Sequence, residues 1–326
     1  MLDLIRRYWF ITGLLLVFAL TIADSSETVS GVGIWFKIHR GPDVVIIIIF
    51  FFSGLILKAR QIKSGLTDIK GTLIALSIIF LIAPIISILW GILPFNTGVK
   101  IGFFLVAAMP TTLSSGVVMT GAAGGNRAHA LVITVLANGF AVFTVPITLS
   151  LLLNLVGGTT VVAIEKSAIM IKILLFVLSP LCIGLLIKFY AKSLIDRVDT
   201  KLQILNQFLV LGIVWMAVSQ AKQTIINSGE MIGIVFLSSL IFHGILLASG
   251  FLFTRFFRLG QGRMESVIFM GGQKTLVLSV ILQVSLFPQY GLALVVCVMH
   301  HIVHLVMDGY LVGRLRSCSR EQIKEG

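Results

Sequence analysis

The sequence predicts an all-α membrane protein in which ten transmembrane helices form two inverted five-helix repeats. Of its 326 residues, 57% are hydrophobic and only 12% are charged, whereas soluble domains contain roughly 25% charged residues. Apolar runs of about 20 residues, the length that crosses a bilayer as a helix, follow one another along the chain. The spacing of these runs in the second half repeats that of the first half.

The apolar runs lie close together between short basic loops, which predicts one transmembrane domain over residues 1–326 and no separate soluble domain. The first run resembles a signal peptide because Arg6 and Arg7 precede it. We interpret it as an uncleaved span, because the five-helix repeat needs it. The ten predicted spans are residues 8–23, 43–58, 70–91, 99–120, 128–153, 168–188, 203–220, 231–254, 264–285 and 290–312.

Adding 161 to the first residue of each of the first five spans gives 169, 204, 231, 260 and 289, close to where the second five begin. Because each half has an odd number of spans, the second half must cross in the opposite sense, as in many secondary transporters. Lysine and arginine gather on one side, which predicts that both termini are cytoplasmic. Topology thus explains the net charge of +12 without a nucleic-acid partner. The predicted repeats cover about residues 5–155 and 166–316, followed by a cytoplasmic tail at 317–326.

Two spans are interrupted at corresponding positions of the halves. The fourth contains AAMPTTLSSGVVMTG, in which Pro110 removes a backbone donor and Gly116 loosens the helix. The ninth contains GGQKTL at 271–276, the window reached by adding 161 to the positions from Pro110 to Ser115. A broken helix exposes carbonyl groups at one end and N–H groups at the other, so the pair predicts a site for a cation and an anion.

Hydroxyl and amide side chains gather at the two breaks and on the fifth span, where Thr134 and Asn138 share a helix face. Their oxygens can replace the hydration shell of an alkali ion. Small polar residues also mark close helix packing, but two equivalent breaks favour a site. The candidate ion-binding or coupling residues are Ser114, Ser115, Thr134, Asn138, Gln273, Lys274 and Thr275. The candidate substrate or crossover residues are Pro110, Thr111, Thr112, Gly116, Gly271 and Gly272.

Lys274 is the one basic residue that belongs to neither face of the membrane. It lies eleven residues beyond Arg263, or about 16 Å along a helix, which is half a bilayer of roughly 30 Å. A central lysine costs about 2.5–3.5 kcal/mol on insertion scales, so such a residue is a functional candidate. The structural alternative is a lysine whose ammonium is satisfied by backbone carbonyls of the crossing break.

The tenth span contains MHHIVHLVMDGY, in which His300, His304 and Asp308 recur every four residues and share one face, while His301 points elsewhere. Such a stripe suits polar packing, a proton or gating role, or a metal site. A metal site needs further ligands, and the other histidines of the apolar runs, His129 and His243, are isolated in the sequence.

The stretch PTTLSSGVVMTGAAGGNRAHALVITVLANGF, followed by GGQKTL, resembles the bile acid:sodium symporter family and most closely its YfeH-like branch, which includes the seventh human member. The resemblance implies a panel domain of helices 1, 2, 6 and 7 and a core domain of helices 3, 4, 5, 8, 9 and 10, with helices 4 and 9 unwound and crossing. It also implies two sodium ions beside the crossover and an organic anion as cargo. By motif, Ser115 and Thr134 match the first sodium site and Gln273 matches the second.

Three departures from the family pattern weaken the implied sodium chemistry. An asparagine ligand is replaced by Gly116, a serine by Ala130 and the glutamate that serves both ions by Phe269. We therefore expect one sodium ion at most, at Ser115, Thr134 and Asn138. Lys274 could instead replace a sodium ion, attract an anionic cargo or carry a proton.

The sequence thus predicts a secondary active transporter, and not an enzyme, in a bacterial inner membrane. It predicts ion-coupled symport of a small organic anion, bile-acid-like, sulfated or carboxylate, by alternating access. Na⁺ is the expected coupling ion and no other cofactor is expected. The alternatives are a proton-coupled carrier using Lys274, a channel or regulatory membrane protein, and an intramembrane metalloenzyme built on the tenth-span histidines. Ser219 and Gln220 are expected to line the cargo pocket from the panel.

Overall fold

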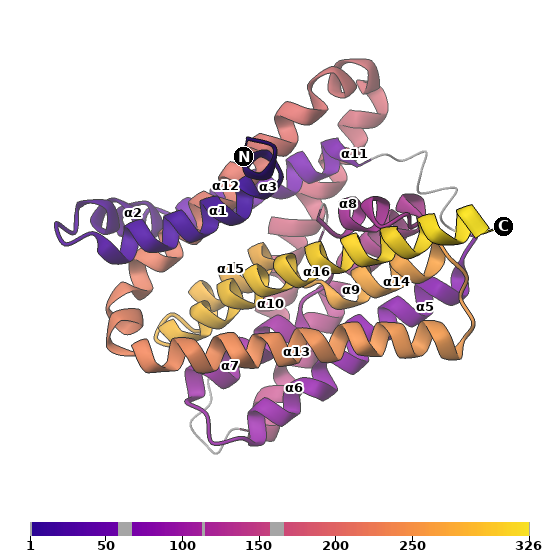
Figure 1. The fold of residues 1–326 in the computed structure, drawn as a ribbon. Coiled ribbons are helices and arrows are strands. Elements are labelled where there is room, and N and C mark those ends of the chain that lie inside the picture. The colour runs from indigo at the N-terminus through magenta and orange to yellow at the C-terminus, as the bar shows by residue number, and fades with distance from the viewer. Residues whose placement is uncertain (1, 58–66, 113–114, 157–165, 326) are drawn as a thin grey trace.

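The structure, a computed structural model, describes residues 2–57, 67–112, 115–156 and 166–325. Within these ranges every regular element is a helix (Figure 1). The helices are α1 (Leu2–Ala23), α2 (Thr28–Ile38), α3 (Gly41–Ile56), α5 (Ile69–Ser77), η1 (Ile78–Ile82), α6 (Ala83–Ile92), α7 (Thr97–Ala108), α8 (Ser115–Ala122), α9 (Arg127–Val156), α10 (Lys166–Ile173), η2 (Leu174–Leu178), α11 (Ser179–Tyr190), α12 (Lys192–Asn227), α13 (Gly229–Phe256), α14 (Arg263–Gly272), α15 (Leu276–Leu286) and α16 (Gly291–Glu325).

Helices occupy each of the ten predicted runs, and the prediction of an all-α membrane protein is confirmed. In the described ranges, seven helical stretches are long and apolar enough to cross a membrane, or up to eight if a bent pair near the N-terminus counts as one. The apolar helices α3 and α7 are shorter. The number of ten spans and the inverted repeat stay predictions.

Helix α2 was not expected from the sequence, because its residues lie between the first two predicted spans, 8–23 and 43–58. The chain bends by 109° between Thr12–Ala23 and Thr28–Ile38. At this turn the Asp24 carboxylate accepts hydrogen bonds from the Ser26 hydroxyl and from the Ser30 amide and hydroxyl. The bond from Ser26, followed by those from Ser30, lowers the pKa of Asp24 to about 2. The polar run after Ala23 therefore ends α1 instead of continuing it.

The helices pack in two groups (Figure 1). Helix α12 packs along α1, α2 and α3, and α3 also packs against α11. Helices α3 and α11 approach closely because glycines lie at their contact. A Cβ on Gly54 would lie only 2.2 Å from the Leu181 carbonyl oxygen, and one on Gly184 would lie 2.2 Å from the Phe51 carbonyl oxygen. The second group joins α5, α6, α7, α9, α13, α14 and α16. The division into panel and core domains stays a prediction.

The π-helical turn η1 frees one backbone carbonyl at mid-helix. The amide of Ala83 donates to the carbonyl of Ile78, five residues back, and the next residue is Pro84, which has no N–H. The carbonyl of Ile79 therefore loses its usual helical donors. Its new partner lies at the functional site.

Polar side chains bind α5, α9 and α14 together at one end of the second group. Arg263 donates from Nε and Nη2 to the two carboxylate oxygens of Asp68, at 2.6 and 2.5 Å. The buried ring of His129 contacts the hydroxyl of Ser266 at 2.6 Å and that of Thr72 at 3.1 Å. His129 is thus not isolated, because residues far apart in the chain surround it.

We predict that Asp68→Asn destabilises the protein by about 1–3 kcal/mol, since a charge-assisted bidentate pair is lost. Burial raises the pKa of the Asp68 carboxyl, but hydrogen bonds from Arg263 and from the Gly71 amide outweigh it and leave the pKa below 3.8. The stabilisation should therefore be complete above about pH 4 and disappear as the pH falls through the pKa of the folded state. Thermal unfolding of both proteins across this range measures it.

The matched control is Asp196→Asn, because Asp196 forms an ion pair with Lys188 but its side chain is 45% exposed. An exposed pair contributes only about 0–1 kcal/mol. Equal effects of the two substitutions would contradict a special role for the Asp68 pair.

Candidate functional site

Two interrupted helices meet in the middle of the second group. Helix α7 ends at Ala108 and α8 begins at Ser115, while α14 ends at Gly272 and α15 begins at Leu276. The extended segments touch, since the amide of Thr275 donates to the carbonyl of Pro110 at 2.9 Å. We call this region the crossover.

Two glycines allow α14 to approach its neighbours closely. A Cβ on Gly271 would lie 3.1 Å from the side chain of Ile78, and one on Gly272 would lie 3.3 Å from Leu247. Neither contact leaves room for a larger residue without some adjustment. The glycine pair therefore serves close packing of the crossover against η1 and α13.

Gln273 is the centre of a hydrogen-bond network that joins the two breaks. Its carbonyl oxygen accepts from the hydroxyl of Thr112 at 2.6 Å and from that of Ser115 at 2.9 Å. The oxygen of Thr112 also accepts from the Gly116 amide at 3.1 Å, which satisfies a free N–H at the start of α8. Thr112 and Gln273 are 161 residues apart, the offset between the predicted repeats.

Asp308 determines which way the Gln273 amide points. Its carboxylate accepts from Gln273 Nε2 at 2.7 Å and contacts His243 Nε2 at 2.9 Å, and both Asp308 and His243 are fully buried. The NH₂ group of Gln273 thus faces Asp308, and its carbonyl faces the hydroxyls of Thr112 and Ser115. His243 is isolated in the sequence, but the fold brings it to Asp308, whose carboxylate contacts Gln273 and His243.

Lys274 is held entirely by backbone. Its ammonium donates to the carbonyl oxygens of Ile79 at 2.8 Å, Ala107 at 3.1 Å and Met109 at 3.1 Å, and the residue is only 2% exposed. In the part of the chain that the structure describes, it forms no ion pair. This is the arrangement expected from the structural alternative. Lys274 does not line the cavity described below, so it does not reach into that cavity to attract an anion.

The predicted sodium ligands Thr134 and Asn138 lie beside the fourth-span break. Asn138 Nδ2 donates to the carbonyls of Thr134 at 2.9 Å and Thr111 at 3.4 Å, and the Thr134 hydroxyl donates to Ala130 at 2.9 Å and to Thr112 at 3.5 Å. The buried oxygens Asn138 Oδ1 and Thr111 Oγ1 have no hydrogen-bond partner among the described residues. Two unpaired neutral oxygens suit an alkali ion, which prefers such ligands.

The other predicted ligands are placed less favourably for sodium. Ser115 donates to Thr112 and Gln273, and Ser114 lies outside the described residues. Phe269 is fully buried beside Ala123 and Val312, so an apolar cluster fills the place of the missing carboxylate. A Cβ on Gly116 would lie 2.7 Å from the sulfur of Met270, so an asparagine would need repacking there.

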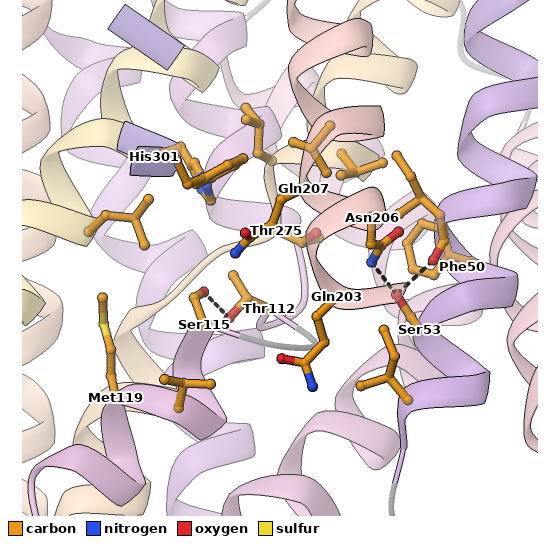
Figure 2. Close-up of a pocket in the computed structure, with 18 residues that line it drawn as sticks. Phe50, Ser53, Thr112, Ser115, Met119, Gln203, Asn206, Gln207, Thr275 and His301 are labelled. Carbon is orange, nitrogen blue, oxygen red and sulfur yellow. Dashed lines mark hydrogen bonds between the residues drawn. The ribbon is translucent and has the colours of Figure 1, made fainter. Parts of the chain in front are cut away.

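A cavity of about 260 Å³ lies between the two helix groups, against the crossover. Gln203 and Gln207 of α12 face Thr275 and the start of α8, while Asn206 turns to Ser53 and donates to its hydroxyl at 3.1 Å (Figure 2). None of the described residues that line it is Asp, Glu, Lys or Arg. They are Phe10, Ile49, Phe50, Ser53, Ile56, Thr112, Ser115, Val118, Met119, Gln203, Asn206, Gln207, Val210, Thr275, Leu276, Val277, His301 and Leu305.

The sequence analysis did not predict the polar residues that α12 contributes to this cavity, which are Gln203, Asn206 and Gln207. Ser219 and Gln220 do not line it, and the Ser219 hydroxyl is satisfied by the Trp215 carbonyl at 2.8 Å. The useful signal was the spacing of Gln203, Asn206 and Gln207, which places three amides on one helix face.

The tenth-span histidines pack as a buried cluster with His243. The rings of His243, His300 and His304 have centroids 5.5–5.7 Å apart. His301 packs edge-on against His304, with ring centroids 4.5 Å apart, and also lines the cavity and packs edge-on against Phe10. Among the described residues, no group of three or more His, Cys, Asp or Glu side chains is arranged to hold a metal ion.

We predict that Gln273→Glu destabilises the protein strongly, because it places a second carboxylate against Asp308 in a buried site. Adding Asp308→Asn should recover most of the lost stability, because the asparagine amide can then donate to the new carboxylate. Thermal unfolding of the single and double variants at neutral pH measures the coupling. If the double variant were no more stable than Gln273→Glu alone, the Gln273–Asp308 hydrogen bond would not explain the effect.

Comparison with known proteins assigns the chain to a family. Residues 8–317 match the SBF-like CPA transporter family (DUF4137). The probable sodium/metabolite cotransporter BASS4 of Arabidopsis thaliana chloroplasts is 28% identical over 281 residues, which span 81% of this chain and 63% of that protein. The sodium/bile acid cotransporter 7 of Xenopus tropicalis is 25% identical over 336 residues, which span 97% of this chain and 94% of that protein. The chain therefore belongs to the SBF-like CPA transporters, within the bile acid:sodium symporter family, and not to a family of enzymes.

Proposed function

We propose that the protein is a secondary active transporter that carries a small organic anion together with one sodium ion. The observation that supports this most is the cavity of about 260 Å³, where amides of α12 face the starts of two half-helices. Relatives are named sodium/metabolite and sodium/bile acid cotransporters. Alternating access would then move the core helices against the panel helices around this cavity.

The cavity suits an anion although its described lining has no formal positive charge. Ser115 begins α8 and Leu276 begins α15, and both line the cavity. Helix N-termini carry partial positive charge and free N–H groups, so they bind carboxylate and sulfate oxygens. The volume is below the roughly 300–1,000 Å³ of pockets for drug-sized ligands, which favours a small carboxylate or sulfated metabolite over a whole bile salt.

Sodium coupling is supported by the position of Asn138 and Thr111. Their unpaired oxygens adjoin the segment that leads into α8, and Thr112 of that segment lines the cavity. A sodium ion bound to these oxygens would hold Thr111 in place beside Thr112, whose hydroxyl oxygen accepts from the Gly116 amide of α8, and so stabilise the anion site there. Binding of the ion and of the cargo would thereby favour each other.

The runner-up is a carrier coupled to protons through Lys274, which the nearly complete burial of that side chain supports. The three carbonyl partners favour the sodium carrier instead. A neutral amine has two donors and would leave one of the three carbonyls without a hydrogen bond. We also propose that the protein belongs to the YfeH-like branch and lies in a bacterial inner membrane with both termini in the cytoplasm, as the basic loops suggest.

We predict that Asn138→Leu abolishes the sodium dependence of uptake into proteoliposomes, because it removes the unpaired oxygen and keeps the side-chain volume. Thermal unfolding in a screen of anionic metabolites, with sodium or choline chloride, should identify a cargo whose stabilising effect grows with sodium. Asn138→Asp is the matched control and should keep or strengthen the sodium response. Uptake that follows pH alone would favour the runner-up, and uptake driven by neither gradient would contradict the proposal.

We predict that Gln203→Leu weakens cargo binding roughly tenfold, as the loss of one hydrogen bond of about 1.4 kcal/mol would. Stabilisation by sodium alone should stay as in the unchanged protein, since Gln203 lies on α12 and away from Asn138. Gln220→Leu is the control on the same helix, because Gln220 does not line the cavity. An equal loss in both variants would contradict the assignment of this cavity to the cargo.

A further inference from the structure

Three backbone carbonyls around the Lys274 ammonium form a small oxygen cage. The oxygens belong to Ile79 of η1 and to Ala107 and Met109 at the end of α7, at 2.8–3.1 Å from Nζ. We call these three oxygens the carbonyl cradle. It is distinct from the unpaired oxygens of Asn138 and Thr111.

Each carbonyl of the cradle is available because the helix that carries it is interrupted. Ile79 loses its donors to the π-helical turn and to Pro84. At the end of α7, the Met109 amide turns back to Val106 at 3.2 Å, and Pro110 has no amide hydrogen to offer. Both interruptions direct oxygens to one point, where the C-terminal end of α7 adds negative potential.

We propose that the carbonyl cradle is a monovalent-cation site whose resident ion is the ammonium of Lys274. Rings of backbone carbonyls replace the hydration shells of alkali ions in other membrane proteins. An ammonium carries three donors, and the cradle supplies three acceptors. The Lys274 side chain thus places a cation of the protein's own in this site. When that side chain is shortened, the three carbonyls can bind a free alkali or alkylammonium ion instead. This inference does not depend on the transport cycle.

The alternative is that Lys274 acts only as a structural pin between η1, α7 and α14. A pin and a tethered ion both predict lower stability when the side chain is shortened. They differ in how the shortened protein responds to added cations, because only a cation site can be refilled from solution. Refilling is therefore the property to measure.

The experiment uses full-length protein carrying Asn138→Leu, so that the proposed sodium site contributes nothing. Into this background we would introduce Lys274→Ala or, as the matched control, Lys274→Met. The alanine variant lacks three methylenes and the ammonium, which together have the size of n-propylammonium. The methionine variant also lacks the charge, but its apolar side chain fills the space that the lysine methylenes occupy. Thermal unfolding would be followed in choline chloride with added n-propylammonium, sodium or potassium chloride.

The expected result is a lower midpoint for both variants in choline. The alanine variant alone should then gain, by on the order of a few degrees and with saturation, when n-propylammonium or an alkali ion is added. Folding of the alanine variant only in the presence of one of these cations would support the proposal equally. The proposal is overturned if no cation raises the midpoint of the alanine variant by more than it raises that of the methionine variant, or if the alanine variant fails to fold in every salt.

A failure of this test would leave sodium-coupled uptake untouched, because that is measured in protein with Lys274 in place. Conversely, a protein without sodium-dependent uptake could still show refilling of the cradle. The two outcomes therefore distinguish this inference from the proposed function.

Discussion

Breaking two helices inside a membrane leaves backbone groups that must find partners within the protein, and this constraint shapes the centre of the molecule. The Lys274 ammonium satisfies three carbonyls, two of them at the end of α7. The Thr112 hydroxyl satisfies an amide at the start of α8, and the Thr275 amide satisfies the carbonyl of Pro110. Lys274 and Thr275 of one break thus compensate carbonyl groups of the other, while Thr112 compensates an amide within its own break.

The network around Gln273 links this backbone arrangement to two buried residues that do not line the cavity. His243 of α13 and Asp308 of α16 fix the Gln273 amide, and the amide in turn fixes the hydroxyls of Thr112 and Ser115. Those two residues line the cavity. The buried acid therefore acts at a distance, by setting hydrogen-bond direction and not by meeting the cargo.

Much of the fold and part of the site could be predicted from the sequence. Hydropathy identifies the segments that lie in lipid, so the apolar runs coincide with helices. Pro110 and Gly271 identify the breaks, because proline and glycine destabilise a helix at their own positions whatever surrounds them. The first helix ends at Ala23 as predicted, but α2 was missed because Thr28–Ile38 lies between the first two predicted spans. Carbonyls of the crossing break were one of the alternatives for Lys274, but its third partner, Ile79, and the partners of Asp308 and His129 could not be predicted. They come from segments far apart in the chain, and only packing decides which of several polar groups a buried side chain meets.

The tethered cation has an electrical consequence. An ion taken from solution is released on the far side of the membrane, so its charge counts toward the net charge moved per cycle. The Lys274 ammonium returns with the empty carrier, so it adds nothing to that net charge. One sodium ion and one monovalent carboxylate would then move no net charge per cycle. Accumulation of such a cargo would be driven by the sodium concentration ratio alone and would be insensitive to membrane voltage, worth about 2.3 kcal/mol per charge at 100 mV.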